Sequence, residues 1–170
     1  SVFRLTVPRA PAPPVAAIAE PALDAIALDG LAVLVIDDEA PIRLALADLL
    51  DAWGCDCIAA ADADAALAQA ARWRRPPDAL LCDYRFAHGN GIDVVARVRG
   101  TLGANLPALI VTGDISAERL VEIARSDLPV MHKPVNPARL REWLAEVATA
   151  ASGAIPGGPP PPPPASGNSP

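Results

Sequence analysis

The chain has 170 residues and a formal net charge of −6, which leaves room for one domain of ordinary size and additional segments. The acidic balance argues against a nucleic-acid-binding surface, and no apolar run approaches the roughly 20 residues that a membrane span needs. The first residues lack the apolar core and the small-residue cleavage site of a secretory signal. We therefore expect a protein without direct contacts to nucleic acid or membrane.

Three segments flank or contain the predicted domain. Residues 1–8 alternate Phe3, Leu5 and Val7 with polar side chains, the period of a half-buried strand, and are interpreted as the cut end of another domain. Residues 9–30 are rich in Pro and Ala, which favours an extended linker. The domain itself is placed at 31–149. Residues 150–170 contain Gly, Ser and an unbroken proline run, so we predict a disordered tail, with an SH3-like groove as an alternative partner for it.

The predicted domain alternates short apolar runs with helical patterns five times. Helix signals separate the runs: Pro41 suits an early helix position, Gly54 ends the first helix and Asn136 caps the last. This order predicts an α/β fold, a parallel sheet with right-handed crossovers and helices on both faces. The expected strands are 31–36, 55–59, 79–83, 108–111 and 128–132, and the expected helices begin near Pro41, Asp62 or Asp64 (ending near Trp73), Ile92, Ser116 and Pro137.

The cysteines indicate no disulfide framework. Cys55, Cys57 and Cys82 all fall in apolar, strand-like runs, where reduced and buried thiols are expected. A Cys/His metal site would need further ligands at suitable spacing, which His88 and His132 do not supply.

Four of the apolar runs end on a polar group. Asp37 and Asp38 follow the first strand, Asp83 ends the third, Thr112 follows the fourth and Lys133 follows the fifth. In an open α/β sheet, ligands bind at the carboxyl ends of the strands. The sequence therefore predicts one site at that edge of the sheet.

The acidic part of this site suits a cation. If the first and third strands are neighbours, Asp37, Asp38 and Asp83 repel one another, and their proximity is tolerated when a cation lies among them. Oxygen ligands with room for water are typical of Mg²⁺. Glu39 begins the first helix, where its charge favours the helix dipole, so we do not place it among the ligands.

The same residues predict phosphoryl transfer to a carboxylate. A carboxylate such as Asp83 can act as nucleophile and become an aspartyl-phosphate, and the transfer needs in-line positioning and cations more than covalent help. Lys133 is the single lysine beside thirteen arginines, and a compact point charge suits this role. The hydroxyl of Thr112 can donate to a phosphoryl oxygen. For Lys133 to turn back toward Asp83, we predict a cis peptide before Pro134.

Asp37-Asp38, Asp83, Thr112 and Lys133-Pro134 together resemble the response-regulator receiver domain over roughly residues 31–148. The resemblance implies a flavodoxin-like (βα)5 doubly wound parallel sheet of strand order 2-1-3-4-5. It implies that Asp83 accepts a phosphoryl group from phosphohistidine, that Asp38 and Asp83 bind Mg²⁺ directly, that Asp37 acts through water and that the backbone carbonyl of Arg85 completes the protein ligands.

The resemblance also implies a biological setting. Residues 1–8 resemble the last strand of the ATP-binding domain of sensor histidine kinases, so we expect the C-terminal receiver of a bacterial hybrid kinase, cytoplasmic or part of a membrane-attached sensor. The expected partner is a histidine kinase or a histidine phosphotransfer protein, with a second copy of the chain left open. The receiver would catalyse only its own phosphorylation and dephosphorylation, whereas the parent protein would be a phosphotransferase.

The chain departs from the family pattern at two places. Phe86-Ala87 stands where Met-Pro is frequent, and Val130 stands where many receivers carry Tyr or Phe, so an aromatic switch is not carried over. In resembling receivers, the positions of Arg85 and Asp114 tune self-dephosphorylation. We expect these two side chains to face each other across the mouth of the site.

Three alternative functions share part of this pattern. A free-standing or scaffold-type receiver, acting through protein contacts, shares every site residue with the hybrid kinase. A flavodoxin-like nucleotide or flavin binder needs a Gly/Ser-rich phosphate loop after the first strand, where Asp37, Asp38 and Glu39 have the opposite charge. A hydrolase of the aspartyl-phosphate type needs a second Asp two residues after the nucleophile of the first strand, and Glu39 and Ala40 do not fit that spacing.

Overall fold

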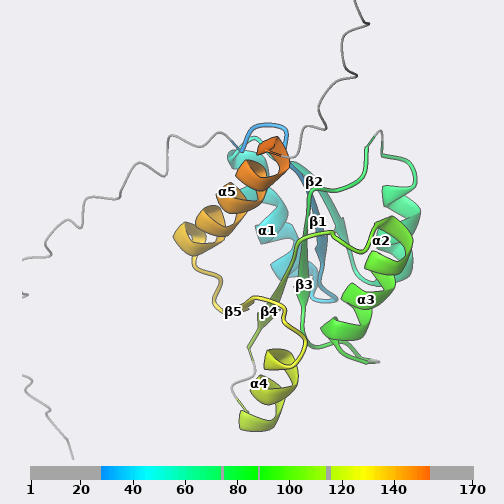
Figure 1. The fold of residues 1–170 in the computed structure, drawn as a ribbon, viewed down its shortest axis with the longest axis vertical. Helices are drawn as coiled ribbons and strands as arrows, with labels where there is room; N and C mark the ends of the chain where they lie inside the picture. The colour runs from blue at the N-terminus through cyan, green and yellow to red at the C-terminus, as the bar shows by residue number, and fades with distance from the viewer. Residues whose placement is uncertain (1–27, 74, 88, 114–115, 154–170) are drawn as a thin grey trace, which may run out of the picture.

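The computed structural model describes residues 28–73, 75–87, 89–113 and 116–153. Strands and helices alternate through this part of the chain, as Figure 1 shows. The order is β1 (Ala32–Ile36), α1 (Ala40–Ala52), β2 (Asp56–Ala60), α2 (Ala63–Ala70), β3 (Ala79–Asp83), α3 (Gly91–Leu102), β4 (Ala108–Thr112), α4 (Ala117–Ala124), β5 (Val130–His132) and α5 (Pro137–Gly153).

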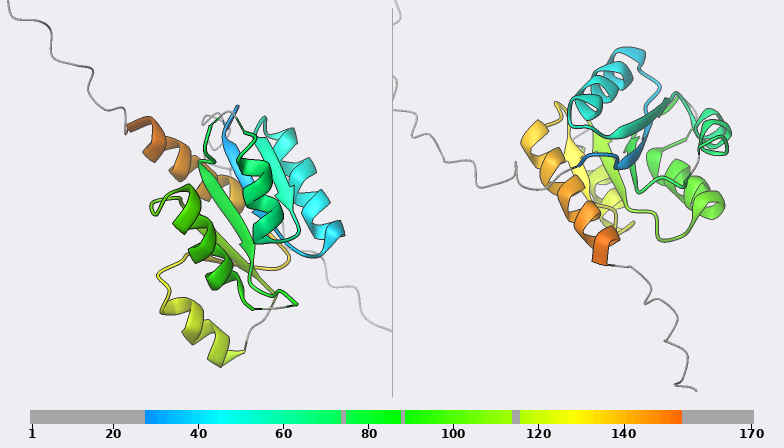
Figure 2. Two further views of the ribbon diagram at one scale, coloured as in Figure 1. Left: turned by 90° about the vertical axis from the view of Figure 1, so that its right-hand side faces the viewer. Right: turned by 90° about the horizontal axis from the view of Figure 1, so that it is seen from above.

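The five strands form one parallel sheet of order β2-β1-β3-β4-β5. This is the flavodoxin-like (βα)5 fold that the sequence predicted, and the prediction is confirmed. In Figure 1, α1 and α5 cover one face of the sheet while α2 and α3 cover the other. Figure 2 shows the same layers from the side and from above. The order reverses between β1 and β3, which is where ligands bind in sheets of this type.

Helices cover both faces of the sheet. Successive strand residues point to opposite faces, so each strand contributes to both layers of the core. On β1, Val33 and Val35 pack with α1 and α5, whereas Leu34 and Ile36 pack with α2 and α3. Ile123 of α4 joins this second cluster. Strands covered on both sides are expected to be continuously apolar rather than alternating. The strands β1, β3 and β4 are buried throughout, whereas the edge strands β2 and β5 are partly exposed.

Local signals set most helix boundaries. The side chains of Asp62, Asn90 and Asn136 accept hydrogen bonds from backbone N–H groups three residues later, at 2.8, 2.9 and 3.2 Å. Gly54 has a φ of 79°, the left-handed conformation that lets the chain leave α1 and enter β2. The Lys133–Pro134 peptide is cis, which confirms that prediction.

Several boundaries differ from the sequence prediction, among them the start of β5, which begins at Val130 rather than at Leu128. Helix α2 ends at Ala70 rather than near Trp73, because the N–H groups of Arg72 and Trp73 bond three residues back in a tighter turn. Helix α5 continues to Gly153, past the predicted domain end at 149, because Ala150 and Ala151 are good helix formers. Strand β2 begins one residue later than predicted.

The segments flanking the domain are only partly described. Leu28, which the sequence placed in the linker, is 1% exposed and packs in the cluster with α1 and α5. Its carbonyl accepts a weak hydrogen bond from Cys55 Sγ at 3.6 Å. The kinase-like segment 1–8, the linker up to residue 27 and the tail from residue 154 lie outside the described residues. Among the helices that are described, none is long and apolar enough to cross a membrane.

Candidate functional site

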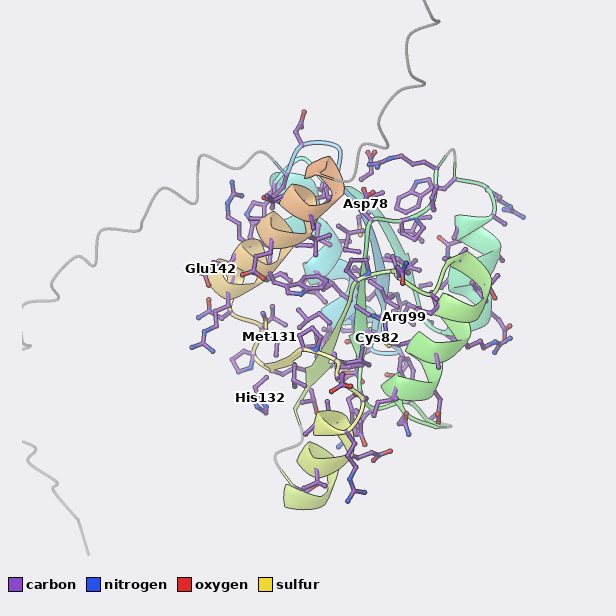
Figure 3. All side chains as sticks on the ribbon, viewed as in Figure 1. Asp78, Cys82, Arg99, Met131, His132 and Glu142 are labelled. Atoms are coloured by element: carbon purple, nitrogen blue, oxygen red, sulfur yellow. The ribbon has the colours of Figure 1, made fainter. Side chains whose placement is uncertain are left out.

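Strand register brings the predicted site residues to one edge of the sheet. Ile36 of β1 pairs with Cys82 of β3, so Asp37 and Asp83 follow side by side. On the other side of β3, Thr112 of β4 pairs with His132 of β5, which places Lys133 one step further. In Figure 3, Asp78 lies above Cys82 along the sheet and His132 lies toward the lower end, the end at which β3 and β5 finish.

Lys133 is the centre of the charge cluster at this edge. Its Nζ lies 2.6 Å from Asp83 Oδ1, 3.1 Å from Asp37 Oδ2 and 3.8 Å from Glu39 Oε1. Its backbone N–H donates to the Thr112 carbonyl at 2.8 Å, which fixes the start of the side chain. One lysine therefore faces carboxylates from the ends of β1 and β3.

The two buried carboxylates receive further hydrogen bonds from the backbone. Asp37 Oδ1 accepts from the Glu39 N–H at 2.8 Å, and Asp83 Oδ2 accepts from the Arg85 N–H at 2.7 Å. Asp37 is 2% exposed and Asp83 is 5% exposed. Buried carboxylates are tolerated when their oxygens are paired in this way.

Burial and charge act in opposite directions on this cluster. Burial raises the pKa of the Asp83 carboxyl above its usual range, and the nearby Asp37 charge adds to this, against the lowering effect of Lys133 and the Arg85 N–H. For Lys133, burial disfavours the charged form, but the hydrogen bonds to Asp83 and Asp37 prevail and raise its pKa above the usual value. The lysine thus remains charged while Asp83 ionises less readily than an exposed carboxyl.

A cavity of about 440 Å³ opens over Asp83. Its walls include the exposed residues Asp38 and Glu39 on one side and the Arg85-Phe86-Ala87 loop on another, with Gly113 and Lys133 completing the lining. Asp37 and Thr112 do not line this cavity, because both are buried. The structure therefore places Asp38, Asp83, Arg85 and Lys133 at the cavity, whereas Asp37 is buried but bonded to Lys133, and Thr112 is buried at the end of β4. Asp114 lies outside the described residues.

The donor set at the cavity fits a hydrated divalent cation. Asp38 and Asp83 present carboxylate oxygens to the same space, and no nitrogen or sulfur ligand is among the lining residues. Within the described part of the chain, no three Asp, Glu, His or Cys side chains converge closely enough to hold an ion by themselves. Mg²⁺ is commonly bound by one or two carboxylates, with water or phosphate at its remaining coordination positions.

Sequence reasoning missed two residues that act on this site. Glu39 was assigned to the helix dipole alone, but its carboxylate lies at the cavity and approaches Lys133. Arg43, one turn into α1, donates from Nη1 to the Asp37 carbonyl at 2.6 Å and so holds the acidic turn. The spacing of Glu39 and Arg43 on one helix face was readable, but the direction in which each side chain turns was not.

The Cys82 thiol, next to Asp83 in the chain, is not part of the cavity. It is fully buried on the opposite side of the strand, contacts the Asp83 carbonyl at 3.3 Å, and burial raises its pKa well above the usual value. Cys55 and Cys57 are also free thiols, with pKa values raised by burial to about 11 and about 12. All three thiols are therefore protonated and unreactive near neutral pH.

A doubly wound sheet with an acidic pocket and a lysine at its switch point is the architecture of a signalling domain. Comparisons with known proteins identify the same class. The family model "Response regulator receiver domain" matches residues 33–145, and the chain belongs to this family. The phosphate regulon transcriptional regulatory protein PhoB of Pseudomonas aeruginosa is 30% identical over 115 residues, 65% of this chain and 48% of that protein. The chain thus spans about half the length of this curated relative.

Solved structures give the same family. The chemotaxis protein CheY4 of Vibrio cholerae is 30% identical with a TM-score of 0.58, covering 68% of this chain and 96% of that one. A response regulator receiver protein from Pseudomonas putida is 29% identical with a TM-score of 0.59, covering 67% and 94%. Each match covers nearly all of the solved chain, so the described domain corresponds to a whole receiver.

Proposed function

We propose that this chain is the phosphoacceptor of a two-component phosphorelay and that Asp83 receives the phosphoryl group from phosphohistidine. The observation that carries the proposal is the contact of 2.6 Å between Lys133 Nζ and Asp83 Oδ1 at the floor of the acidic cavity. A carboxylate that is buried, paired with a lysine and open to a cavity on one side is suited to nucleophilic attack on phosphorus.

The residues divide the work of the transfer. An Asp83 oxygen forms a bond to phosphorus while the P–N bond to the donor imidazole breaks, and the imidazole leaves with the electron pair. Lys133 lies where it can neutralise charge on a phosphoryl oxygen. Thr112, buried at the end of β4, would donate its hydroxyl to another oxygen once the phosphoryl group is present.

We also propose Mg²⁺ as the cofactor. Asp38 and Asp83 would hold it directly, Asp37 through water, and the Arg85 carbonyl would complete the protein ligands. Bound there, the ion would neutralise charge on the phosphoryl oxygens. The exposed Asp38 carboxylate at the cavity wall, beside the Asp83 carboxylate, supports this assignment.

The donor is proposed to dock beside the site. An apolar groove of about 430 Å³ between α1 and the β5–α5 turn is lined by residues such as Pro41, Leu46 and Pro134, and it shares Lys133 with the acidic cavity. Leu44 is 62% exposed on the same helix. A protein that brings phosphohistidine to Asp83 must cover this region. Ala45→Arg, at an exposed residue that lines the groove, should therefore slow transfer from a phosphohistidine protein and leave labelling by acetyl phosphate unchanged.

The wider setting proposed is the C-terminal receiver of a hybrid sensor histidine kinase. The resemblance of residues 1–8 to the end of a kinase ATP-binding domain motivates it. The alternative is a free-standing or scaffold-type receiver that signals through protein contacts. The encoded sequence before Ser1 decides between them, since a phosphoacceptor histidine helix and an ATP-binding domain there would establish the hybrid kinase.

Acetyl phosphate labelling tests the site itself. Intact mass should show one added phosphate in the presence of Mg²⁺, and labelling should disappear in excess EDTA and in Asp83→Asn. Asp48→Asn, which changes an exposed carboxylate on α1 outside the cavity, is the matched control and should label normally. Undiminished labelling of Asp83→Asn would refute the assignment. Mg²⁺ should also raise the thermal midpoint of the wild type, because an ion that binds only the folded state stabilises it.

A further inference from the structure

Glu122 of α4 joins the helix to the chain segment that follows Asp83. Its Oε2 accepts a hydrogen bond from the Tyr84 hydroxyl at 2.6 Å, and its Oε1 accepts one from Asn90 Nδ2 at 3.2 Å. Both donors belong to the β3–α3 connection, whereas the acceptor comes from the helix after β4. The sequence analysis assigned no role to any of the three.

The two donors, Tyr84 and Asn90, lie on either side of Arg85 in the chain, and Arg85 lines the acidic cavity. The Gly91 N–H donates to the Tyr84 carbonyl at 2.7 Å, and Arg85 and Asn90 form an isolated antiparallel bridge, so Tyr84-Arg85 and Asn90-Gly91 lie against each other at the two ends of the connection. The Arg85 N–H donates to Asp83 Oδ2 at 2.7 Å. Arg85 therefore lies between Tyr84 and Asn90, both of which donate hydrogen bonds to Glu122. Its own backbone N–H is hydrogen-bonded to the Asp83 side chain.

We propose that Glu122 is a positioning residue for the Asp83 site, holding the Arg85 backbone in place through Tyr84 and Asn90. This inference rests on the proposed function, because it treats Arg85 as the residue that closes the site. It assigns to α4 a direct mechanical connection with the phosphoacceptor. That connection uses the residue after Asp83 and needs no aromatic side chain on β5, where Val130 stands.

The geometry makes the Tyr84 bond the stronger of the two. Tyr84 is 3% exposed, its N–H donates to the Val111 carbonyl at 2.8 Å, and its hydroxyl meets a carboxylate at a short distance. Hydrogen bonds to ionised acceptors are shorter and roughly twice as strong as neutral ones. The Asn90 bond is longer, and Asn90 also caps α3 through its side-chain oxygen.

A connection of this kind couples the site and α4 in both directions. A change at Asp83 that displaces the Arg85 backbone acts on Tyr84 and Asn90, and through them on Glu122. If binding at the site changes the affinity of α4 for a partner by some factor, linkage requires that the partner change the affinity of the site for its ligand by the same factor. A merely structural role for Glu122 would stabilise α4 and leave the affinity of the site unchanged.

The experiment compares Glu122→Ala, Glu122→Gln and Tyr84→Phe with the wild type. The control is Glu142→Gln on α5, an exposed glutamate that Figure 3 labels on the far side of the sheet from α3. Amide hydrogen exchange reports the loop without metal, since the Arg85 and Gly91 amides are both hydrogen-bonded in it. Titration with Mg²⁺ alone reports the dissociation constant, and acetyl phosphate reports the labelling rate.

We expect faster exchange at Arg85 and Gly91 in Glu122→Ala and Tyr84→Phe, with amides of β2 unchanged. The Mg²⁺ dissociation constant should rise about fivefold in Glu122→Ala, the lower end of typical coupling, with a smaller rise in Glu122→Gln and none in Glu142→Gln. Faster exchange with an unchanged dissociation constant and labelling rate would overturn the positioning role, as would unchanged exchange. If the wild type neither binds Mg²⁺ nor labels, the proposed function fails, and the exchange data still decide whether Glu122 holds the loop.

Discussion

Lys133 Nζ lies 2.6 Å from Asp83 Oδ1, and the two side chains are only 18% and 5% exposed. An ion pair this far removed from water gains Coulomb energy but loses hydration, so its net stabilisation is small unless the geometry is favourable. Here the lysine is shared with Asp37, and its backbone is fixed to Thr112. The arrangement is therefore better explained by chemistry at Asp83 than by stability.

Lys133→Arg should lower the rate of acetyl phosphate labelling by about 10²-fold, the effect of removing one charge contact in a transition state. A planar guanidinium cannot occupy the position of a compact ammonium between Asp83 and Asp37. The rate is measured by intact mass against time at saturating Mg²⁺. Circular dichroism verifies that the variant is folded, and near-normal labelling of a folded variant would exclude Lys133 as a phosphate contact.

Asp83→Asn should stabilise the metal-free domain at pH 7. Burial raises the pKa of Asp83 in the folded state, so the folded chain binds more protons than the unfolded one just above the usual carboxyl pKa of about 4. Stability must then fall as pH rises through the window between that value and the raised one, and the loss persists at neutral pH. Lys133 adds no pH dependence in this window, because the stability that comes with its raised pKa is fully present below its usual value of about 10.4 and is lost only as pH rises above it.

The measurement is urea unfolding of both proteins in EDTA between pH 4 and pH 8. We expect Asp83→Asn to gain about 1 kcal/mol at pH 7, an ordinary size for a single substitution, and the gain to shrink toward pH 4. Asp48→Asn should show no such pH-dependent gain. A variant that is less stable than the wild type at pH 7 would contradict the raised pKa of Asp83.

Gly91→Ala should destabilise the domain by about 2–3 kcal/mol, in the range found for overpacking. A Cβ at Gly91 would lie 2.2 Å from the Asp83 carbonyl oxygen and 2.9 Å from Tyr84 Cα, which are backbone atoms that cannot move without displacing the site. Gly100→Ala is the matched control, because it lies in the same helix with nothing within 4 Å of the added carbon. It should stabilise by about 0.5–1 kcal/mol, and urea unfolding measures both. Equal changes in the free energy of unfolding at the two positions would mean that helix propensity alone accounts for both substitutions.

The fold was predictable because its signals are local. Each strand is a short apolar run, and predicted capping residues such as Asp62 and Asn136 lie where the structure uses them. The meeting of Asp37, Asp83 and Lys133 followed from strand order once the resemblance supplied that order. These are backbone properties, which a pattern of residue types specifies well.

The features that the sequence did not reveal depend on the directions in which individual side chains point. Thr112 lies at the predicted strand end, but it is buried and does not line the cavity, whereas its neighbour Gly113 does. Tyr84 was passed over beside Asp83, since nothing in the chain indicates that Glu122 meets its hydroxyl. Leu28 was assigned to the linker because it stands in a Pro- and Ala-rich stretch, although it packs in the core. Such contacts join residues distant in sequence and leave no periodic signal.

The lifetime of the phosphoryl group on Asp83 should depend on Arg85 and Asp114. Arg85 is exposed at the cavity wall, two residues after Asp83. Asp114 follows Thr112 at the same interval but lies outside the described residues. We expect the two side chains to pair across the mouth and cover the path of a water that attacks phosphorus in line. An exposed pair of this kind contributes only about 0–1 kcal/mol to stability, so its effect should appear in kinetics.

The decay of purified phosphoprotein is measured for the wild type, Arg85→Ala, Asp114→Ala and the double variant. Both single variants should decay faster, because each opens the path for water, and the double variant should decay no faster than the faster single one. This non-additivity is the signature of two groups that act as one barrier. Arg97→Ala, which removes an exposed pair with Asp64 away from the cavity, should decay like the wild type. Equal decay in every variant would show that neither charge guards Asp83, and additive acceleration would show that they act separately.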